Sequence, residues 1–199
     1  MNENSDLKLE LERTLIDLHD ADRLISIDPK NEFYHFLKSY ELLVIILTRS
    51  DIIGAEEFRE GLKEALEEIN IATALNPKNK IFHYYKGHIF FMLNKYEEAL
   101  EEYNKVLLID PNDKEVRRYK IEILMLMQKY EDVLKEFNKM IENDPDDKEA
   151  HFSKAIYFKK LNWFKESLNE YRKAILIDYY KVLDKLFSDA GIKKKKNKN

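Results

Sequence analysis

A proline-marked repeat of 34 residues is the feature that most constrains how this chain folds. Prolines stand at positions 29, 77, 111 and 145, and the last two intervals are each 34 residues long. A lysine follows nine residues after each proline, and a leucine precedes each by eleven. A fixed period of this length indicates stacked helical hairpins.

The residues around each proline predict where the helices end and begin. Each proline follows an Asp or Asn, and a residue before proline disfavours the α conformation. Two residues after the prolines stand Asn31, Asn79, Asp113 and Asp147. Such side chains cap a helix by accepting hydrogen bonds from its free amides. We therefore expect a helix to start directly after each of these four residues.

The first repeat is longer than the others. Pro29 and Pro77 are 48 residues apart, which exceeds the repeat by 14. Fourteen residues correspond to about four helical turns. We predict that both helices of this hairpin, residues 31–49 and 55–75, are longer by about two turns, with a turn at residues 50–54.

The two ends differ from the central repeats. Residues 5–27 predict a helix that matches the second helix of a repeat, so the array opens on a half-repeat. No proline follows residue 177, so the last helix either continues or bends near Asp178. Residues 179–190 predict a capping helix, with Gly191 as its stop. Residues 191–199 hold five lysines and no acid, which is typical of a disordered tail.

These segments together predict one all-α domain over residues 5–190. Its parts are the N-terminal helix 5–27, the repeats 32–79, 80–113, 114–147 and 148–178, and the capping helix 179–190. Charged residues make up 36% of the 199, with four glycines and four prolines. This composition suits long solvated helices rather than a turn-rich β fold.

Composition also bounds the environment of the chain. No cysteine is present, which excludes disulfides, thiolate metal sites and a cysteine nucleophile. The longest apolar run, residues 42–47, is far shorter than the roughly 20 residues that span a bilayer. Residues 1–12 lack the apolar core of a secretory signal. We therefore expect a cytoplasmic protein that has no membrane partner.

The charge is distributed unevenly. The net charge is −4, and the tail contributes five positive charges, so residues 1–190 carry −9. An acidic body argues against nucleic acid as the main ligand. The tail, Lys193 to Lys198, could attract phosphates or anionic lipid, but such segments more often serve solubility. We expect no nucleic-acid partner.

Histidines are the first candidates for chemistry. His35, His83 and His151 fall six residues after successive prolines, and Arg117 takes that place in the remaining copy. Equivalent positions lie about one hairpin apart, which is too far for a shared metal ion. We therefore expect these histidines to replace bulky apolar residues in packing, and we predict no metal site.

Acidic residues are numerous, as in the run from Glu97 to Glu102, and lysines are interspersed with them. This pattern indicates a solvated surface crossed by salt bridges. The sequence contains no glycine-rich phosphate loop, nucleophile elbow or zinc-protease motif. We predict that the protein is not an enzyme and has no cofactor.

The spacing and residue types resemble the tetratricopeptide repeat family. Residues 80–113 match its pattern best, through Gly87, Phe90, Tyr96, Ala99, Tyr103, Val106 and Pro111. The other copies depart at Ile121, where a small residue is usual, and at Ser167 and Tyr179. The resemblance implies a right-handed α-solenoid of about four helical hairpins. Small residues at the contacts let helices approach to about 8–10 Å.

The resemblance also implies a concave surface lined by residues four, seven, eleven and fourteen after each proline. The predicted groove residues are Phe36, Tyr40, Tyr84, His88, Phe91, Arg118, Glu122, Phe152 and Ile156, and Leu43 belongs to the same register. The lysine, asparagine and arginine clamp with which family members grip an acidic C-terminus is absent from the matching positions.

These features predict a protein–protein interaction module, an adaptor or scaffold that binds a partner peptide or helix in a partly aromatic groove. Two alternatives stay open. The protein's own side chains could fill the groove, or the chain could be a structural protein that forms a homo-oligomer. Self-association would use the terminal helix or the extended hairpin at residues 31–75.

Overall fold

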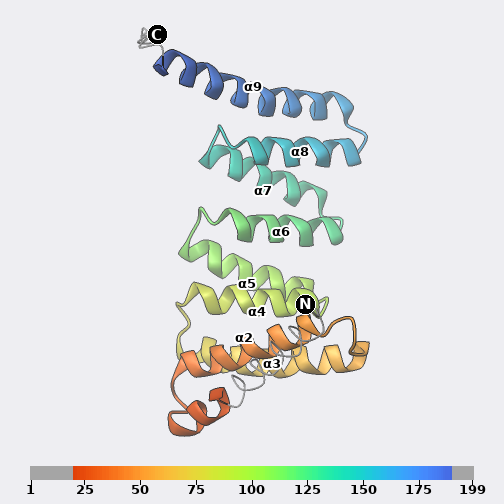
Figure 1. Cartoon of the computed structure of the whole chain (residues 1–199). Helices are drawn as coiled ribbons and strands as arrows, with labels where there is room; N and C mark the ends of the chain where they lie inside the picture. Colours follow the sequence, from red (N-terminus) through yellow and green to blue (C-terminus); the bar gives the residue numbers. More distant parts are fainter. Residues whose placement is uncertain (1–19, 190–199) are drawn as a thin grey trace, which may run out of the picture. The chain divides into compact units, whose positions relative to one another are not determined.

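The computed structural model describes residues 20–189, and every regular element in this range is an α-helix. The chain divides into two compact units, residues 1–123 and 124–199, which are described separately. The first unit contains helical residues 20–27, α2 (Glu32–Thr48), α3 (Ala55–Leu75), α4 (Lys80–Met92), α5 (Tyr96–Ile109) and residues 114–123 of α6 (Lys114–Leu126) (Figure 1). The second contains α7 (Tyr130–Asn143), α8 (Lys148–Lys160) and α9 (Phe164–Asp189). The predicted all-α fold is confirmed.

The predicted helix starts are confirmed by their caps. The side chains of Asn31 and Asn79 accept a hydrogen bond from the N–H two residues on, each at 3.0 Å. Those of Asp113 and Asp147 accept from the N–H three residues on, also at 3.0 Å. Each bond satisfies one free amide of the following helix and is worth about 1 kcal/mol.

The short turns inside the hairpins use a device that was not predicted. Asn94, Gln128 and Asn162 adopt φ values of 59°, 57° and 61°. The N–H of the next residue then bonds back to a carbonyl of the last helical turn, as Lys95 does to Phe90 at 2.8 Å. This left-handed cap satisfies carbonyls that the helix end would otherwise leave free.

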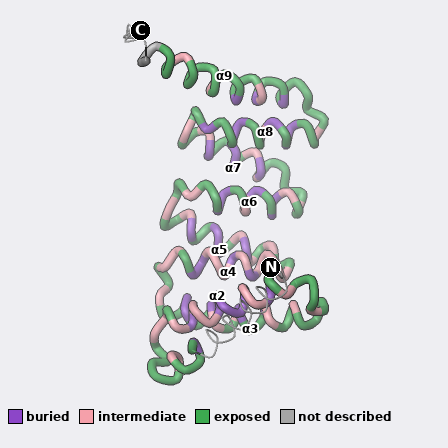
Figure 2. Tube along the Cα trace, viewed as in Figure 1, coloured by how far each residue is buried: buried purple, intermediate pink, exposed green. Residues whose placement is uncertain are grey.

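Helices of one hairpin pack closely through small residues. An added Cβ at Gly87 of α4 would lie 2.7 Å from the ring of Tyr103 on α5. The Ser39 hydroxyl donates to the Ala65 carbonyl at 2.8 Å, and Ser167 makes the same bond to Ala155. Residues on the facing sides of the helices are therefore buried, while the opposite sides are exposed (Figure 2).

The long first hairpin divides its additional residues unequally. α2 has 17 residues and α3 has 21, against 13 and 14 in α4 and α5. The turn between α2 and α3 covers residues 49–54, against 93–95 in the next hairpin. The increase is thus about one turn in α2 and two in α3, rather than the expected two in each. The remaining residues lengthen the turn.

At the C-terminus, α9 is one helix of 26 residues. It continues through residues 179–189, so the segment expected as a separate capping helix is the last part of α9. Asp178 does not interrupt it, because no proline there removes a backbone donor. Residues 5–19 of the expected N-terminal helix and the tail 191–199 lie outside the described residues.

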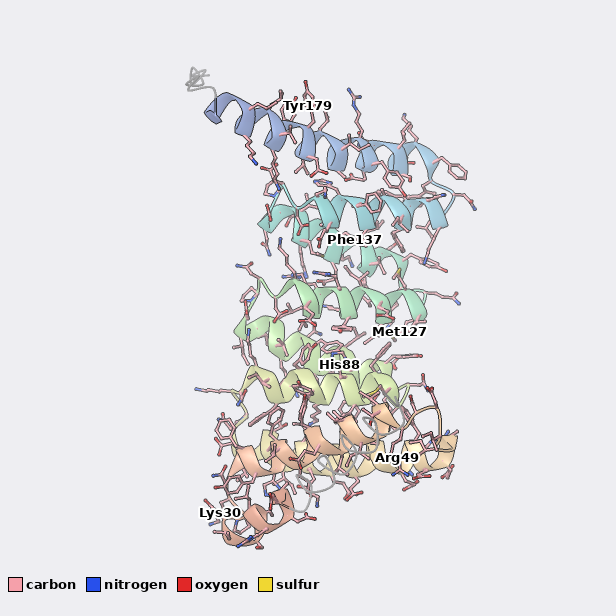
Figure 3. The ribbon with its side chains drawn as sticks, in the orientation of Figure 1. Lys30, Arg49, His88, Met127, Phe137 and Tyr179 are labelled. Atoms are coloured by element: carbon pink, nitrogen blue, oxygen red, sulfur yellow. The ribbon has the colours of Figure 1, made fainter. Side chains whose placement is uncertain are left out.

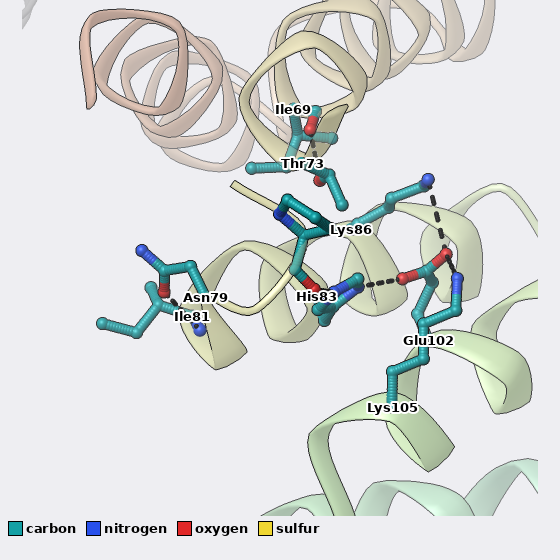
Figure 4. Close-up of polar contacts among 9 residues, drawn as sticks. Ile69, Thr73, Asn79, Ile81, His83, Lys86, Glu102 and Lys105 are labelled. Atoms are coloured by element: carbon teal, nitrogen blue, oxygen red, sulfur yellow. Dashed lines mark hydrogen bonds and ion pairs between the residues drawn. The ribbon is translucent and has the colours of Figure 1, made fainter. Parts of the chain in front are cut away.

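A buried polar contact links the two helices of the second hairpin. The ring of His83 is 4% exposed, with Nδ1 2.6 Å from Glu102 Oε2 and Nε2 2.9 Å from the Pro77 carbonyl oxygen. Lys86 and Lys105 reach the other carboxylate oxygen at 3.3 and 2.8 Å (Figure 4). We call this arrangement of histidine, glutamate and lysine the polar latch.

Ionisation of the glutamate follows from its neighbours. Burial alone would raise the pKa of Glu102, but hydrogen bonds from Lys105 and His83 and the charge of Lys86 hold it below its ordinary value. A carboxylate and a carbonyl can only accept hydrogen bonds. Each ring nitrogen of His83 that carries a proton therefore donates it to the acceptor that it faces, Glu102 or the Pro77 carbonyl. The latch ties the inter-repeat turn at Pro77 to the second helix.

The polar latch recurs in both units. His35 contacts Glu68 at 2.7 Å and the Pro29 carbonyl at 3.0 Å. His151 contacts Glu170 at 2.5 Å and the Pro145 carbonyl at 3.2 Å. The lysines that stand nine residues after the prolines, Lys38 and Lys154, reach the same two glutamates.

In the third copy Arg117 takes the place of the histidine. Its Nη2 donates to the Pro111 carbonyl at 2.7 Å. Two expectations from the sequence are therefore wrong. The histidines do not replace apolar packing residues, and Glu102 is not part of the solvated surface, since it is 3% exposed. The physical reason is that Glu102 lies on the side of α5 that faces α4, where His83 and two lysines compensate its charge.

Candidate functional site

Aromatic side chains of the first unit form a connected set, which we call the aromatic cluster. Neighbouring rings in it have centroids 4.3 to 6.2 Å apart. α2, α4, α5 and residues 114–123 of α6 all contribute. Its members are Phe33, Phe36, Tyr40, Phe82, Tyr84, Tyr85, His88, Tyr103 and Tyr119.

Helical spacing brings these rings together. On α2, Phe33, Phe36 and Tyr40 follow one another at steps of three and four residues, and on α4 His88 stands four residues after Tyr84 and three after Tyr85. Residues at such steps share one side of a helix. His88, labelled in Figure 3, lies on α4, and its ring is 4.3 Å from that of Tyr119 on α6. The cluster therefore joins adjacent hairpins of the first unit.

Two buried rings anchor the cluster, and others are open to solvent. Phe82 and Tyr103 are fully buried, whereas Phe33 and Tyr40 are 58% and 41% exposed. Tyr40 and Tyr85 meet at 90° with centroids 5.6 Å apart. Edge-to-face pairs of this kind are favourable and hold each ring in a defined orientation. The exposed rings of Phe33 and Tyr40 thus each pack against another ring of the cluster.

Tyrosines and a glutamate set the electrostatics of the cluster. The Tyr84 hydroxyl donates to Glu115 Oε1 at 3.0 Å. Burial and the nearby carboxylate raise the pKa of Tyr84, and burial, Tyr40 and Glu115 raise that of Tyr85. Burial lowers the pKa of His88 below 6.5. At neutral pH the cluster therefore presents uncharged rings beside a negative carboxylate.

The hydroxyl of Tyr103 stands out among the buried polar groups. Within the part of the chain that the structure describes, it has no hydrogen-bond partner. Its ring stacks on Tyr119 at 24°, and burial raises its pKa, with Tyr119, Glu122 and Glu115 acting in the same direction. A buried hydroxyl without a partner costs about 1–3 kcal/mol. The Tyr103 hydroxyl is therefore a polar group in the core of the first unit whose burial is unfavourable.

Some predicted groove residues lie in the aromatic cluster and others do not. Phe36, Tyr40, Tyr84 and His88 are members of it. Phe91 is half-buried and pairs with Tyr96 at 6.1 Å.

Arg118 and Glu122 are exposed on α6. Leu43, expected to line the groove, is 4% exposed and belongs to the apolar core of the first hairpin. That expectation is wrong because Leu43 packs into the core that α2, α3 and α4 share, although Tyr40 one turn before it on the same side of α2 is 41% exposed.

The remaining two predicted residues belong to the second unit. Phe152 and Ile156 lie on α8 and are 49% and 39% exposed. The ring of Phe152 packs edge-on against Tyr171 of α9 at 5.2 Å. They form an apolar surface of their own hairpin.

Sequence reasoning missed Tyr85 and Tyr119 as site residues. Both stand eight residues after a proline, and the position before each, seven residues after the proline, was predicted to line the groove. The signal was therefore present as a repeated tyrosine at the same offset. Tyr103 was identified only as a packing residue of the repeat, because the sequence does not reveal the surroundings of its hydroxyl.

Among residues 20–189, no group of three or more His, Asp or Glu side chains is placed to hold a metal ion. No helix in the same range combines the length and apolar character needed to cross a membrane.

Comparison with known proteins supports the family. Residues 81–113 match the model of the tetratricopeptide repeat. Crystal structures of MamA, YrrB and TTC0263 share the fold, with TM-scores of 0.63, 0.62 and 0.58 and sequence identities of 15%, 19% and 18%. The aligned regions cover 92%, 86% and 76% of this chain and 98%, 81% and 76% of those chains. No curated protein matches the chain significantly in sequence.

YrrB is described as a TPR protein with an unusual peptide-binding site, and TTC0263 as a thermophilic TPR protein of Thermus thermophilus. The predicted repeat is confirmed over residues 81–113, and the chain has the fold of tetratricopeptide-repeat proteins. This fold supports protein-interaction and scaffold roles in general, and its members are generally not enzymes.

Proposed function

We propose that this protein is a non-catalytic interaction module that binds a segment of a partner protein on the aromatic cluster. The observation that carries the proposal is that the same cluster contains both buried rings and exposed rings. Phe82 and Tyr103 hold the cluster in place, while Phe33 and Tyr40 present much of their surface to solvent. Aromatic residues that lose little entropy on binding commonly dominate interface energies.

The alternative, that the cluster only fills space, fits the exposure less well. Side chains that serve packing alone are buried, as Tyr103 is at 0%. Exposed apolar side chains that cluster together mark interaction surfaces more often than single ones do. The peptide-binding site described for YrrB, a protein of the same fold, is consistent with this use. A cytoplasmic location and the lack of nucleic-acid and membrane partners belong to the same proposal.

The test removes one exposed ring, Tyr40, and one half-buried ring, Tyr84, and leaves the buried rings of Phe82 and Tyr103 in place. The double variant Tyr40→Ala/Tyr84→Ala is compared with wild type in affinity capture from native extract, followed by titration of the captured partner. The control is Tyr179→Ala, because Tyr179 is 56% exposed on α9. We expect the double variant to bind at least about 30-fold more weakly, as for central interface aromatics. The control should bind as wild type does.

Thermal unfolding followed by circular dichroism separates binding from packing. We expect the double variant to stay folded, with a midpoint close to that of the control. A collapse of the midpoint, together with no capture by the wild type, would mean that the rings serve only the fold. The proposed function would then be wrong.

Self-association is a second candidate, favoured by the exposed apolar side of α9. Leu168, Ile175, Val182 and Leu186 are between 57% and 70% exposed. Light scattering of the full chain over a hundred-fold concentration range tests it. A mass that rises with concentration in wild type, but not in Leu168→Glu/Ile175→Glu, would support a homo-oligomer through α9. A constant monomer mass would exclude it.

A further inference from the structure

We propose that the aromatic cluster selects a partner segment carrying a lysine or arginine side chain, which lies over the tyrosine rings beside Glu115 and Glu122. This inference rests on the proposed function and specifies the chemistry of its partner. It is drawn from three features of the first unit: the acids on α6, the uncharged rings and the ring geometry.

The two acids of α6 lie at the cluster. Glu115 is exposed, and its carboxylate accepts the hydrogen bond of Tyr84 at 3.0 Å. The Tyr84 ring contacts those of Tyr85, His88 and Tyr119, so Glu115 lies beside the middle of the cluster. Glu122 is exposed two turns further along α6 and stands three residues after Tyr119, a spacing that places it on the same side of the helix. Both carboxylates are open to solvent and can reach an incoming cation.

The rings add to the negative potential. A tyrosine face attracts a cation placed within about 6 Å of its centroid. Tyr40 meets Tyr85 at 90°, and Tyr84 meets Tyr119 at 69°. In each of these pairs the edge of one ring lies against the face of the other. The chain already contains such contacts, since Lys86 and Lys95 lie 5.8 and 5.9 Å from the ring of Phe90.

His88 contributes an uncharged ring at neutral pH, because burial disfavours its protonated form. Arg118 is exposed on α6 between the two acids in sequence, so its charge works against a cationic ligand. The net charge of −9 over residues 1–190 favours encounter with a basic segment over a long range. An acidic segment would instead meet Glu115 and Glu122.

The probe is a library of random decapeptides displayed on phage and selected on the immobilised full chain. We expect the retained peptides to be enriched in lysine or arginine. Their affinities are then measured with synthetic labelled copies by fluorescence anisotropy. Tyr40→Ala/Tyr84→Ala should lose them, which shows that they bind at the cluster.

Charge variants decide the inference. At about 50 mM salt, Glu115→Gln/Glu122→Gln should bind the selected peptides roughly five- to ten-fold more weakly, and Arg118→Gln should bind them more tightly. The control Glu142→Gln/Glu166→Gln removes two exposed acids of the second unit and so changes the net charge equally. It should leave the affinity within about two-fold of wild type, because screening weakens distant charges.

The outcomes separate the two proposals. Two results would overturn this inference and leave the proposed function standing. The peptides that bind at the cluster could contain no basic residue, or their affinity could be the same for wild type and for Glu115→Gln/Glu122→Gln. If no peptide depends on Tyr40 and Tyr84, both fail. If a synthetic peptide of residues 191–199 binds as tightly as the selected peptides, the occupant is a second copy, and the assignment to a separate partner is wrong.

Discussion

The aromatic cluster and the matching positions of α8 share one register but differ in chemistry. Seven and eleven residues after a proline, α4 carries Tyr84 and His88, whereas α8 carries Phe152 and Ile156. The rings of α4 connect to three other helices of the first unit. Phe152 packs against Tyr171 of its own hairpin. The same backbone positions can therefore hold a connected polar-aromatic site or a plain apolar surface.

The polar latch shows the opposite behaviour. His83 with Glu102 in the first unit and His151 with Glu170 in the second make the same contacts, at nearly the same distances. Positions that repeat in both units bind helices of the fold together, while positions that differ are free to specialise. Variants at both kinds of position test this division.

Removing the carboxylate of the polar latch should destabilise either unit. Glu102→Ala and Glu170→Ala each leave a buried histidine and lysines without their common acceptor. We expect each to lower the free energy of unfolding by about 3 kcal/mol, the low end for breaking a buried ion pair. Urea denaturation followed by circular dichroism measures the loss.

The matched control is Glu101→Ala, because Glu101 is the exposed neighbour of Glu102 on α5. It should change stability by less than about 0.5 kcal/mol. A loss as small as this in Glu102→Ala would contradict the structural role of the latch. Similar losses in the two units, with peptide affinity unchanged in Glu170→Ala, would sharpen the distinction between latch and cluster.

Gly87 should resist substitution because it lies under a ring of the aromatic cluster. In Gly87→Ala the new Cβ would be 2.7 Å from the Tyr103 ring, which is buried and stacked on Tyr119. Overpacking costs about 1–3 kcal/mol, and alanine in a helix recovers about 1 kcal/mol. We expect a net loss of roughly 1 kcal/mol in thermal or urea unfolding, with altered NMR signals of Tyr119.

Gly61→Ala is a control of the same geometry. Its Cβ would also meet a side chain at 2.7 Å, but the atom is the far end of Ile46, which can rotate away. This variant should be neutral or slightly stabilised, since the gain in helix propensity is then not offset. Equal losses in both variants would contradict the rigidity that we assign to the cluster.

Acid should weaken the polar latch in both units. The surrounding hydrogen bonds and lysines hold the pKa values of Glu102 and Glu170 below 4.5, although burial opposes this. The unfolded chain takes up these protons at a higher pH than the folded chain does. The stabilisation is therefore complete above the ordinary pKa and is lost as the pH falls through the folded-state value.

Urea denaturation between about pH 5 and pH 3 measures this effect, which cannot exceed about 1.4 kcal/mol per pH unit for each carboxylate. Glu102→Gln and Glu170→Gln should each make the acid-induced loss of stability shallower. Glu101→Gln should leave it unchanged. An identical slope in all variants would contradict the ionised state assigned to the latch.

Local sequence was a good guide wherever the physical cause is local. Asn31 and Asp147 cap helices because their side chains reach amides two or three residues away, and proline stops a helix by its own ring. How the additional residues of the first hairpin are shared between its two helices and the turn was harder to predict. A shorter helix with a longer turn uses the same number of residues. The continuity of α9 likewise depends on the absence of a stop signal at Tyr179.

The site was less predictable, because its members come from different helices. Tyr84 and His88 could be selected by their offset from proline, but their contacts with Tyr119 and Glu115 depend on how α4 and α6 pack. The burial of Glu102 could not be read from a run of glutamates, since Glu101 next to it is exposed. One residue of difference turns a side chain by about 100° around the helix.

The hairpin repeat and the helix starts could be predicted from the chain alone, because periodicity, capping and proline act over a few residues. The contact of His83 with Glu102, the connection of the aromatic rings and, within residues 20–189, the lack of a hydrogen-bond partner at the buried Tyr103 hydroxyl became visible only in the folded molecule. These depend on distances between side chains far apart in the chain, which packing alone sets.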